Sequence, residues 1–168
     1  WICSWEGSLT LVNLDERIQA SWQGLNDATS FKEFSPFSIR EAGNNKYWLG
    51  LWGKGIVEFQ LKQDLQIAPL VHINEEMMKG TTAIENIVYD IDMDADNNLW
   101  IGTPYGALKI KNPESPNFTI ERQTNRVPDG SNTQYEAFSV LCDRAGLVWI
   151  GTMAGVSLLD PYAAVFDP

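Results

Sequence analysis

One short segment recurs along this chain and constrains its fold more than any other feature. Trp149-Ile150-Gly151-Thr152 reappears as Trp100-Ile101-Gly102-Thr103 and as Trp48-Leu49-Gly50-Leu51, and the opening residues Trp1-Ile2-Cys3-Ser4 are a degenerate copy. The first tryptophans of these copies stand at positions 1, 48, 100 and 149. A repeat period of about 50 residues indicates stacked supersecondary units.

Each unit has the pattern of four antiparallel strands. A β-branched residue nine positions before each internal tryptophan predicts the first strand: Ile39, Ile91 and Val140. Three positions before the tryptophan stands a residue that tolerates positive φ, which predicts a tight turn into the second strand: Asn45, Asn97 and Gly146. A glycine-containing hairpin and an alternating strand such as 56–61 follow, and less regular fourth strands are predicted over 17–22, 67–73 and 118–122.

The fold class follows from this pattern. No stretch has the periodicity of a long amphipathic helix, so the chain is predicted to be all-β. Four strands in each unit of about 50 residues are typical of β-propeller blades, because a solenoid needs a shorter period. We expect about three and a half four-stranded antiparallel blades of a larger, seven-bladed propeller. The blades should span roughly residues 1–36, 37–85, 86–135 and 136–168 of a single partial domain, 1–168.

The net charge and the lengths of the apolar runs limit which partners are expected. The chain has 12 basic and 22 acidic residues, a net charge of −10, and no Lys/Arg cluster, so nucleic acid is not an expected partner. No apolar run has the length of a transmembrane helix, and this segment is not expected to insert into a membrane. The chain begins at Trp1 in mid-motif, so we interpret it as a piece of a longer protein. Cys3 and Cys142 fall in the first and last units and are expected to be free, buried thiols.

The repeated tryptophans are best explained as structural residues. A large aromatic side chain at the same point of each blade is expected to wedge between neighbouring sheets and bury its ring. This interpretation applies to Trp48, Trp100 and Trp149. The glycines two positions later would let the sheets approach closely: Gly50, Gly102 and Gly151.

The variable residues of the hairpin after each tryptophan are the candidate ligand-binding residues. In a propeller these turns surround the mouth of the central channel. The residues singled out there are Trp5, Trp52, Tyr105 and Met153. Exposed aromatic rings would offer flat platforms for sugar rings or aromatic ligands, and the alternative is that each packs on a neighbouring loop or domain. The loops between units add polar candidates: Asp27, Glu75, Glu76, Asn132, Gln134 and Tyr135.

Metal and catalytic sites are weakly supported. Asp90, Asp92 and Asp94 alternate along one strand and invite a calcium interpretation, yet a loop started at Asp92 lacks the glycine and the bidentate glutamate of an EF-hand. We favour the interpretation that these three carboxylates line a polar channel wall. His72 is the only histidine, so no transition-metal cluster is expected, and no serine stands in a nucleophile elbow. We therefore expect no catalytic residue, no metal and no cofactor in this segment.

The last repeat resembles a known family. Residues 143–152, followed by Gly155-Val156 and Leu159-Asp160-Pro161, are similar to the two-component regulator propeller repeat. Residues 94–103 match it with Asn97 in place of glycine, and residues 42–50 match less well, without the Asp and the Thr. The resemblance implies the periplasmic propeller of a bacterial membrane sensor, followed by a transmembrane helix and a cytoplasmic histidine kinase, hybrid kinase or diguanylate cyclase. Many such sensors respond to oligosaccharides or their breakdown products, and the parent protein would be a homodimer.

Three functions remain in competition. The leading one is an extracytoplasmic segment that binds a small molecule or oligosaccharide, contacts the neighbouring blades or domains of its parent chain, and relays the signal to a kinase or cyclase. The second is a protein-interaction scaffold without output. The third is a propeller glycosidase or lyase, since Asp143 to Trp149 is faintly similar to the Asp-box turn of sialidases, although that turn is structural in those enzymes. The five arginines fall at different phases of the repeat, which argues against an enzyme: Arg17, Arg40, Arg122, Arg126 and Arg144.

Overall fold

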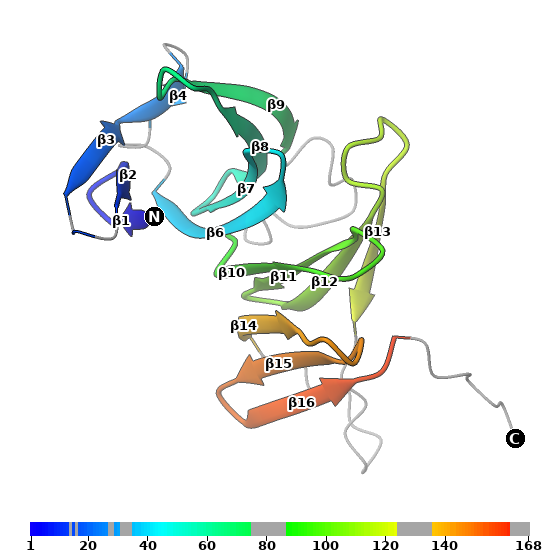
Figure 1. The fold of residues 1–168 in the computed structure, drawn as a ribbon. Helices are drawn as coiled ribbons and strands as arrows, with labels where there is room; N and C mark the ends of the chain where they lie inside the picture. The colour runs from blue at the N-terminus through cyan, green and yellow to red at the C-terminus, as the bar shows by residue number, and fades with distance from the viewer. Residues whose placement is uncertain are drawn as a thin grey trace, which may run out of the picture. The chain divides into compact units, whose positions relative to one another are not determined.

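The computed structural model describes residues 1–13, 15, 17–26, 29–30, 35–74, 87–123 and 136–161. Over these residues the chain forms sixteen β-strands and no helix (Figure 1). None of the described residues belongs to a helix long and apolar enough to span a membrane. The strands are β1 (Ile2–Ser4), β2 (Ser8–Val12), β3 (Ile18–Trp22), β4 (Gly24–Asn26), β5 (Thr29–Ser30), β6 (Pro36–Gly43), β7 (Lys46–Leu51), β8 (Gly55–Leu61), β9 (Ile67–Ile73), β10 (Asp90–Met93), β11 (Leu99–Thr103), β12 (Gly106–Lys111), β13 (Thr119–Gln123), β14 (Ala137–Cys142), β15 (Val148–Thr152) and β16 (Gly155–Leu159).

The strands form one sheet for each sequence repeat. Two sheets have four strands in chain order, β6-β7-β8-β9 and β10-β11-β12-β13, and two have three, β1-β2-β3 and β14-β15-β16. Neighbouring strands pair antiparallel, so each sheet is a meander of consecutive hairpins. The all-β prediction and the repeated four-stranded unit are confirmed. A two-stranded ribbon, β4-β5, is an addition that the repeat pattern does not predict.

The chain divides into two compact units, residues 1–91 and 92–168. In the first unit the core is formed by buried aliphatic and aromatic side chains: Leu9, Leu25, Leu49, Leu51, Val57 and Phe59. Trp1 packs against this core, with its ring centroid 5.0 Å from Tyr47 and 5.8 Å from Phe59. The degenerate first copy of the repeat therefore keeps the packing role of its tryptophan.

Trp100 shows how the sheets of the second unit pack. Its side chain is fully buried and belongs to one apolar cluster with residues of the next sheet, including Ala137, Val140 and Ile150. A Cβ atom built on Gly102 would lie 2.4 Å from the carbonyl oxygen of Ala137. A side chain at this point would hold the sheets apart, which agrees with the predicted role of the glycine.

Trp149 corrects the prediction that every repeat tryptophan is buried. Trp48 and Trp100 are 1% and 0% exposed, whereas Trp149 is 40% exposed. Trp149 lies in register between Leu141 and Leu158, which are also exposed, and Val156 adds to the same row of side chains. The opposite side of this sheet faces Trp100, and among the described residues nothing of the second unit covers the side that carries Trp149. We call this side the open face, defined by Leu141, Trp149, Val156 and Leu158.

The open face is expected to make the isolated chain self-associate, because burying these apolar side chains removes their surface from water. Replacing Val156 and Leu158 together with Lys should shift the chain toward the monomer. Size-exclusion chromatography with light scattering over a wide range of protein concentration measures this shift. Ile18→Lys, at another exposed apolar position, is the control and should leave the association unchanged. A wild-type chain that stays monomeric at high concentration would refute the prediction.

Candidate functional site

The hairpins that carry the predicted ligand-binding residues close in the same way in each repeat. Each ends on a glycine with positive φ, where a side chain would be strained: Gly7 (86°), Gly55 (71°), Gly106 (101°) and Gly155 (130°). This glycine starts the following strand in the last three repeats and directly precedes it in the first. The two or three residues before it are thereby held at the tip of a rigid turn.

Four aromatic side chains of the first unit gather around these turns, and we call them the aromatic cluster: Trp5, Phe37, Trp52 and Tyr89. The ring centroids of Trp5 and Trp52 are 5.1 Å apart, and Phe37 lies 5.9 Å from Trp5 and 5.5 Å from Trp52. Tyr89 adds contacts of 5.8 Å to Trp52 and 6.1 Å to Phe37. Two of the predicted residues, Trp5 and Trp52, are therefore in direct contact although they come from different sheets.

Phe37 and Tyr89 are not among the predicted site residues, although the sequence contains a signal for them. An aromatic residue stands eleven positions before each internal repeat tryptophan: Phe37, Tyr89 and Phe138. This recurrence places an aromatic ring near the beginning of the first strand of each of these three sequence repeats. The period of the tryptophans alone does not reveal it.

The exposure of the aromatic cluster indicates a platform. Trp5 is 64% exposed and Phe37 is 38% exposed, while Trp52 and Tyr89 are half-buried. Trp5 meets Phe37 and Trp52 edge-to-face, and the other ring contacts are tilted, with centroid separations typical of rings in direct contact. A ligand would lie on the outward side of Trp5 and Phe37.

Two hydrogen bonds of Ser35, one from its hydroxyl and one to its carbonyl oxygen, hold the two tryptophan hairpins together. The hydroxyl of Ser35 donates to the carbonyl oxygen of Trp5 at 2.9 Å. The backbone N–H of Trp52 donates to the carbonyl oxygen of Ser35, also at 2.9 Å. Ser35 thus joins both hairpins, and a surface that is already ordered loses less conformational entropy when it binds a ligand.

The other two predicted residues belong to the second unit. Tyr105 is half-buried on the β11–β12 hairpin, where its N–H donates to the Thr103 hydroxyl at 3.2 Å and its carbonyl oxygen accepts from Arg122 Nη1 at 3.0 Å. Met153, on the β15–β16 hairpin, is 83% exposed. They are described on that unit alone and are not members of the aromatic cluster. The loop candidates fall outside the described residues: Asp27, Glu75, Glu76, Asn132, Gln134 and Tyr135.

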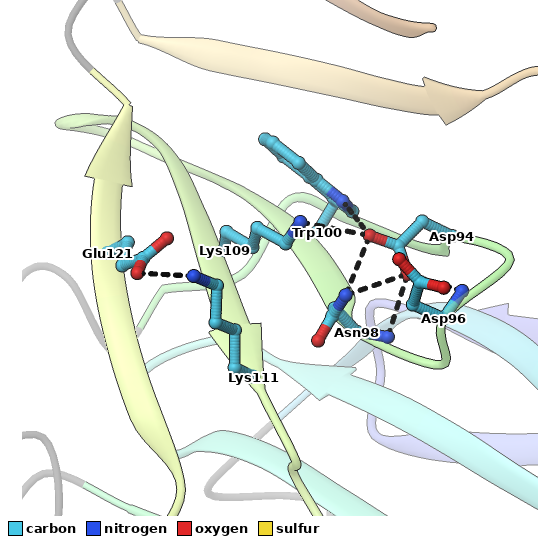
Figure 2. Close-up of polar contacts among 7 residues, drawn as sticks. All are labelled: Asp94, Asp96, Asn98, Trp100, Lys109, Lys111 and Glu121. Carbon is cyan, nitrogen blue, oxygen red and sulfur yellow. Dashed lines mark hydrogen bonds and ion pairs between the residues drawn. The ribbon is translucent and has the colours of Figure 1, made fainter. Parts of the chain in front are cut away.

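The Asp of the turn before β11 anchors the repeat tryptophan, as Figure 2 shows. One carboxylate oxygen of Asp94, Oδ2, accepts from Trp100 Nε1 at 3.0 Å and lies 3.2 Å from Lys109 Nζ. Both oxygens accept from the Asn98 side-chain amide at 3.0 Å, and Oδ1 also accepts the backbone N–H groups of Asp96 and Asn98. Burial raises the pKa of Asp94, but the hydrogen bonds from Asn98, Trp100 and Lys109 together lower it below its ordinary value.

The next repeat contains the same anchor on the surface. Asp143 Oδ2 accepts from Trp149 Nε1 at 2.8 Å, and Oδ1 accepts the N–H groups of Ala145 and Leu147. The hydrogen bond from Trp149, followed by that from Leu147, lowers the pKa of Asp143. These bonds recur at the same spacing, so the acid of the repeat motif fixes the indole ring.

The repeat at 37–85 lacks this acid, since Ala42 takes its place. Its buried carboxylate comes from the strand instead: Glu58, 1% exposed, lies opposite Trp48, as Lys109 lies opposite Trp100. Lys46 Nζ is 3.4 Å from Glu58 Oε1. An ion pair is therefore retained beside the tryptophan, but here the acid is on β8 and the base is on β7.

Figure 2 also shows the pair of Lys111 and Glu121, whose charged atoms lie 2.7 Å apart. Both side chains are exposed, and exposed ion pairs stabilise proteins weakly.

The alternating carboxylates predicted to share a channel wall are engaged in structural bonds. Asp90 Oδ1 accepts from the Ser38 hydroxyl at 2.8 Å, and Asp92 Oδ2 accepts from the Cys142 N–H at 2.6 Å. Asp94 holds the tryptophan anchor. Among the described residues, no group of three His, Cys, Asp or Glu side chains could hold a metal ion.

The two cysteines are free, but both are half-buried rather than buried as predicted. Burial raises the pKa of the Cys3 thiol to about 11. The thiol is therefore protonated near neutral pH and is a poor nucleophile.

Comparison with known proteins agrees with this architecture. Residues 83–105 match the family model described as two component regulator propeller. No curated protein sequence matches the chain. The extracellular domain assigned to the hybrid two component system BT3049 from B. thetaiotaomicron is similar over 89% of this chain, with a TM-score of 0.60 and 18% identity. The corresponding domain of BT4673 from B. thetaiotaomicron is similar over 74%, with a TM-score of 0.50 and 18% identity.

Virginiamycin B lyase from Staphylococcus aureus is also similar, over 94% of this chain with a TM-score of 0.55 and 13% identity. The chain spans 18% of the BT3049 domain, 15% of the BT4673 domain and 50% of the lyase. At these identities the likeness shows a common fold. The chain therefore has the fold of a β-propeller segment, and its residues 83–105 match the two component regulator propeller repeat that its repeated segment resembles.

Proposed function

We propose that this chain is part of the extracytoplasmic, ligand-sensing propeller of a bacterial signal-transduction protein, and that the aromatic cluster contacts the ligand. The observation that carries the proposal is the contact between Trp5 and Trp52, which forms an exposed platform held by Ser35. The family match and the fold shared with extracellular domains of two component systems support the sensing role.

Neutral oligosaccharides fit the platform best. Aromatic faces stack on the apolar faces of sugar rings, and the indole N–H supplies a polar edge. The net charge of −10 disfavours polyanions. The exposed rings of Trp5 and Phe37 would take one sugar residue, with Trp52 supporting them from beneath.

Trp5→Ala should weaken the binding of a neutral oligosaccharide by roughly ten- to a hundredfold, because stacking on one aromatic ring is worth about 1–3 kcal/mol. The experiment titrates a panel of neutral oligosaccharides into the whole extracellular region by isothermal calorimetry and repeats the best ligand with the variant. Leu70→Ala, at an exposed apolar position on β9, is the matched control. Unchanged affinity in Trp5→Ala would exclude the aromatic cluster as the contact surface.

The segment itself is proposed to be non-catalytic. The one histidine is exposed, and its Nε2 bonds a backbone carbonyl oxygen at 2.9 Å. The similarity to virginiamycin B lyase is limited to the fold at 13% identity. Incubation of the segment with the same glycan panel tests this point, since any turnover that follows the protein through purification would establish an enzyme.

The signal is proposed to reach a cytoplasmic kinase or cyclase in a periplasm-facing homodimer of the parent protein. A ligand can shift such an equilibrium only if it binds the two signalling states with different affinity. The flanking parts of the gene provide the test. A membrane span and an output domain downstream support the sensor, and their absence from the complete gene would favour the scaffold.

A further inference from the structure

Two residues on the fourth strands of successive repeats hold hairpins that carry predicted ligand-binding residues. His72 Nε2, from β9, lies 2.9 Å from the carbonyl oxygen of Lys54 in the β7–β8 hairpin. Arg122 Nη1, from β13, donates to the carbonyl oxygen of Tyr105 in the β11–β12 hairpin at 3.0 Å. The first hairpin carries Trp52, and the second carries Tyr105 itself.

The two hydrogen bonds join equivalent positions in two repeats. His72 pairs with Val57 in the sheet register, and Arg122 pairs with Leu108. Val57 and Leu108 each stand two residues after the glycine that closes the hairpin, and the accepting carbonyl belongs to the residue just before that glycine. A contact repeated at equivalent positions by two different side chains indicates a requirement for a donor at this point.

The chemistry of the acceptor defines what the donor must be. A backbone carbonyl oxygen only accepts, so the hydrogen lies on His72 Nε2 in this bond. The neutral Nε2–H tautomer and the imidazolium both provide that hydrogen, and a guanidinium always does. Each bond therefore joins a donor on the fourth strand to the backbone of the turn and supports the turn.

We propose that His72 and Arg122 are positioning residues that fix the hairpins of Trp52 and Tyr105 for ligand binding. The inference rests on the proposed function for its purpose, while the positioning itself can be measured without a ligand. Each donor reaches from the fourth strand to a turn between the second and third strands, so it limits the rocking of that turn against its own sheet.

The two hairpins differ in how strongly they need this support. In the β11–β12 hairpin, the hydroxyl of Thr103 donates to the carbonyl oxygen of Gly106 at 2.8 Å and accepts the N–H of Tyr105, which braces the turn from within. Leu51 takes the place of Thr103 in the β7–β8 hairpin and has no hydroxyl. Removing His72 should therefore loosen its hairpin more than removing Arg122 loosens the other.

The experiment follows the hairpins directly in the whole extracellular region. The protein is labelled with 5-fluorotryptophan, and the ¹⁹F resonance of Trp52 is assigned through Trp52→Phe. In His72→Leu this resonance should broaden or double, and the amide exchange of residues 53–55 should rise by up to about tenfold, as the loss of one hydrogen bond allows. His72→Gln, which keeps an N–H donor at similar reach, should restore the wild-type spectrum, while Arg122→Leu should change the amide exchange of Tyr105 and Gly106 less.

Leu70→Gln, an exposed position on the same strand, is the matched control and should leave the hairpin unchanged. The positioning role is overturned if His72→Leu leaves both the Trp52 resonance and the exchange of 53–55 at wild-type values, or if Gln fails to restore them. A further titration with the best oligosaccharide of the panel separates the two proposals. A loosened hairpin with no binding by the wild type would retain the positioning role and reject the ligand site.

Discussion

Asp94→Asn is expected to lower the free energy of unfolding by about 3–5 kcal/mol, the usual effect of removing one partner of a buried ion pair. The ammonium group of Lys109 lies 3.2 Å from the Asp94 carboxylate, and the two side chains are 9% and 4% exposed. The variant keeps the shape of the turn but leaves a buried positive charge without its counter-charge. Urea unfolding followed by tryptophan fluorescence measures the loss.

The chain offers a control and a rescue for this experiment. Asp143→Asn changes the equivalent acid at an exposed turn, where solvent replaces the lost bonds, and its effect should be much smaller. Leu158 occupies the register position opposite Trp149 that Lys109 occupies opposite Trp100. The double variant Asp94→Asn, Lys109→Leu should therefore recover part of the stability. A double variant less stable than Asp94→Asn would show that the buried charge is not the cause.

The pH dependence of the wild type has a defined sign. The pKa of Asp94 is lowered in the folded chain, so the unfolded state takes up the proton first as the pH falls. The stabilisation from Asp94 is complete above the unfolded value of about 4 and is lost as the pH falls through the folded value below it. The wild type should lose stability more steeply than Asp94→Asn in this acidic range.

Gly102→Ala is expected to destabilise the chain by about 3 kcal/mol, at the upper end of the range for overpacked interiors. Its new Cβ would lie 2.4 Å from the carbonyl oxygen of Ala137, a backbone atom that cannot rotate away. The sheet of β11 and the sheet of β14 would have to separate, which opens the apolar cluster around Trp100. Thermal unfolding of the variant measures the effect.

Gly151→Ala is the matched control, since Gly151 occupies the same place in its repeat. The nearest atom to its added Cβ is the side-chain oxygen of Ser139, at 2.3 Å, which can turn to another rotamer. Its effect should be clearly smaller than that of Gly102→Ala. Equal losses in the two variants would show that intrinsic strand propensity, rather than the approach of the sheets, determines the requirement for glycine.

The sequence predicts what is local to one repeat and misses what depends on the neighbouring sheet. The strands, their turns and the buried positions of Trp48 and Trp100 follow from periodicity, because one hydrophobic pattern repeats in each unit. The exposure of Trp149 could not be predicted in this way, since the residues that cover a tryptophan belong to the next sheet.

For the candidate site too, the sequence predicts individual residues but not their contacts across sheets. Trp5 and Trp52 can be selected from the hairpin pattern, but their contact requires two sheets and the link through Ser35. Phe37 and Tyr89 recur at a fixed distance from the tryptophans, yet nothing in that spacing shows that they meet the hairpin rings. The hydrogen bond from Trp100 to Asp94 is local and could have been inferred, because both belong to one tight turn and the strand after it.

The hydrogen-bonded anchor of Asp and Trp also bears on how repeats are added to such chains by gene duplication. Acid and indole are six residues apart in both repeats that contain the anchor, so a duplicated gene segment that includes the turn brings its own anchor with it. A new copy can therefore orient its tryptophan before any neighbour has adapted to it. Tandem duplication can lengthen this architecture by whole repeats, and a repeat that lacks the acid, such as 37–85 with Ala42, uses a different charge arrangement.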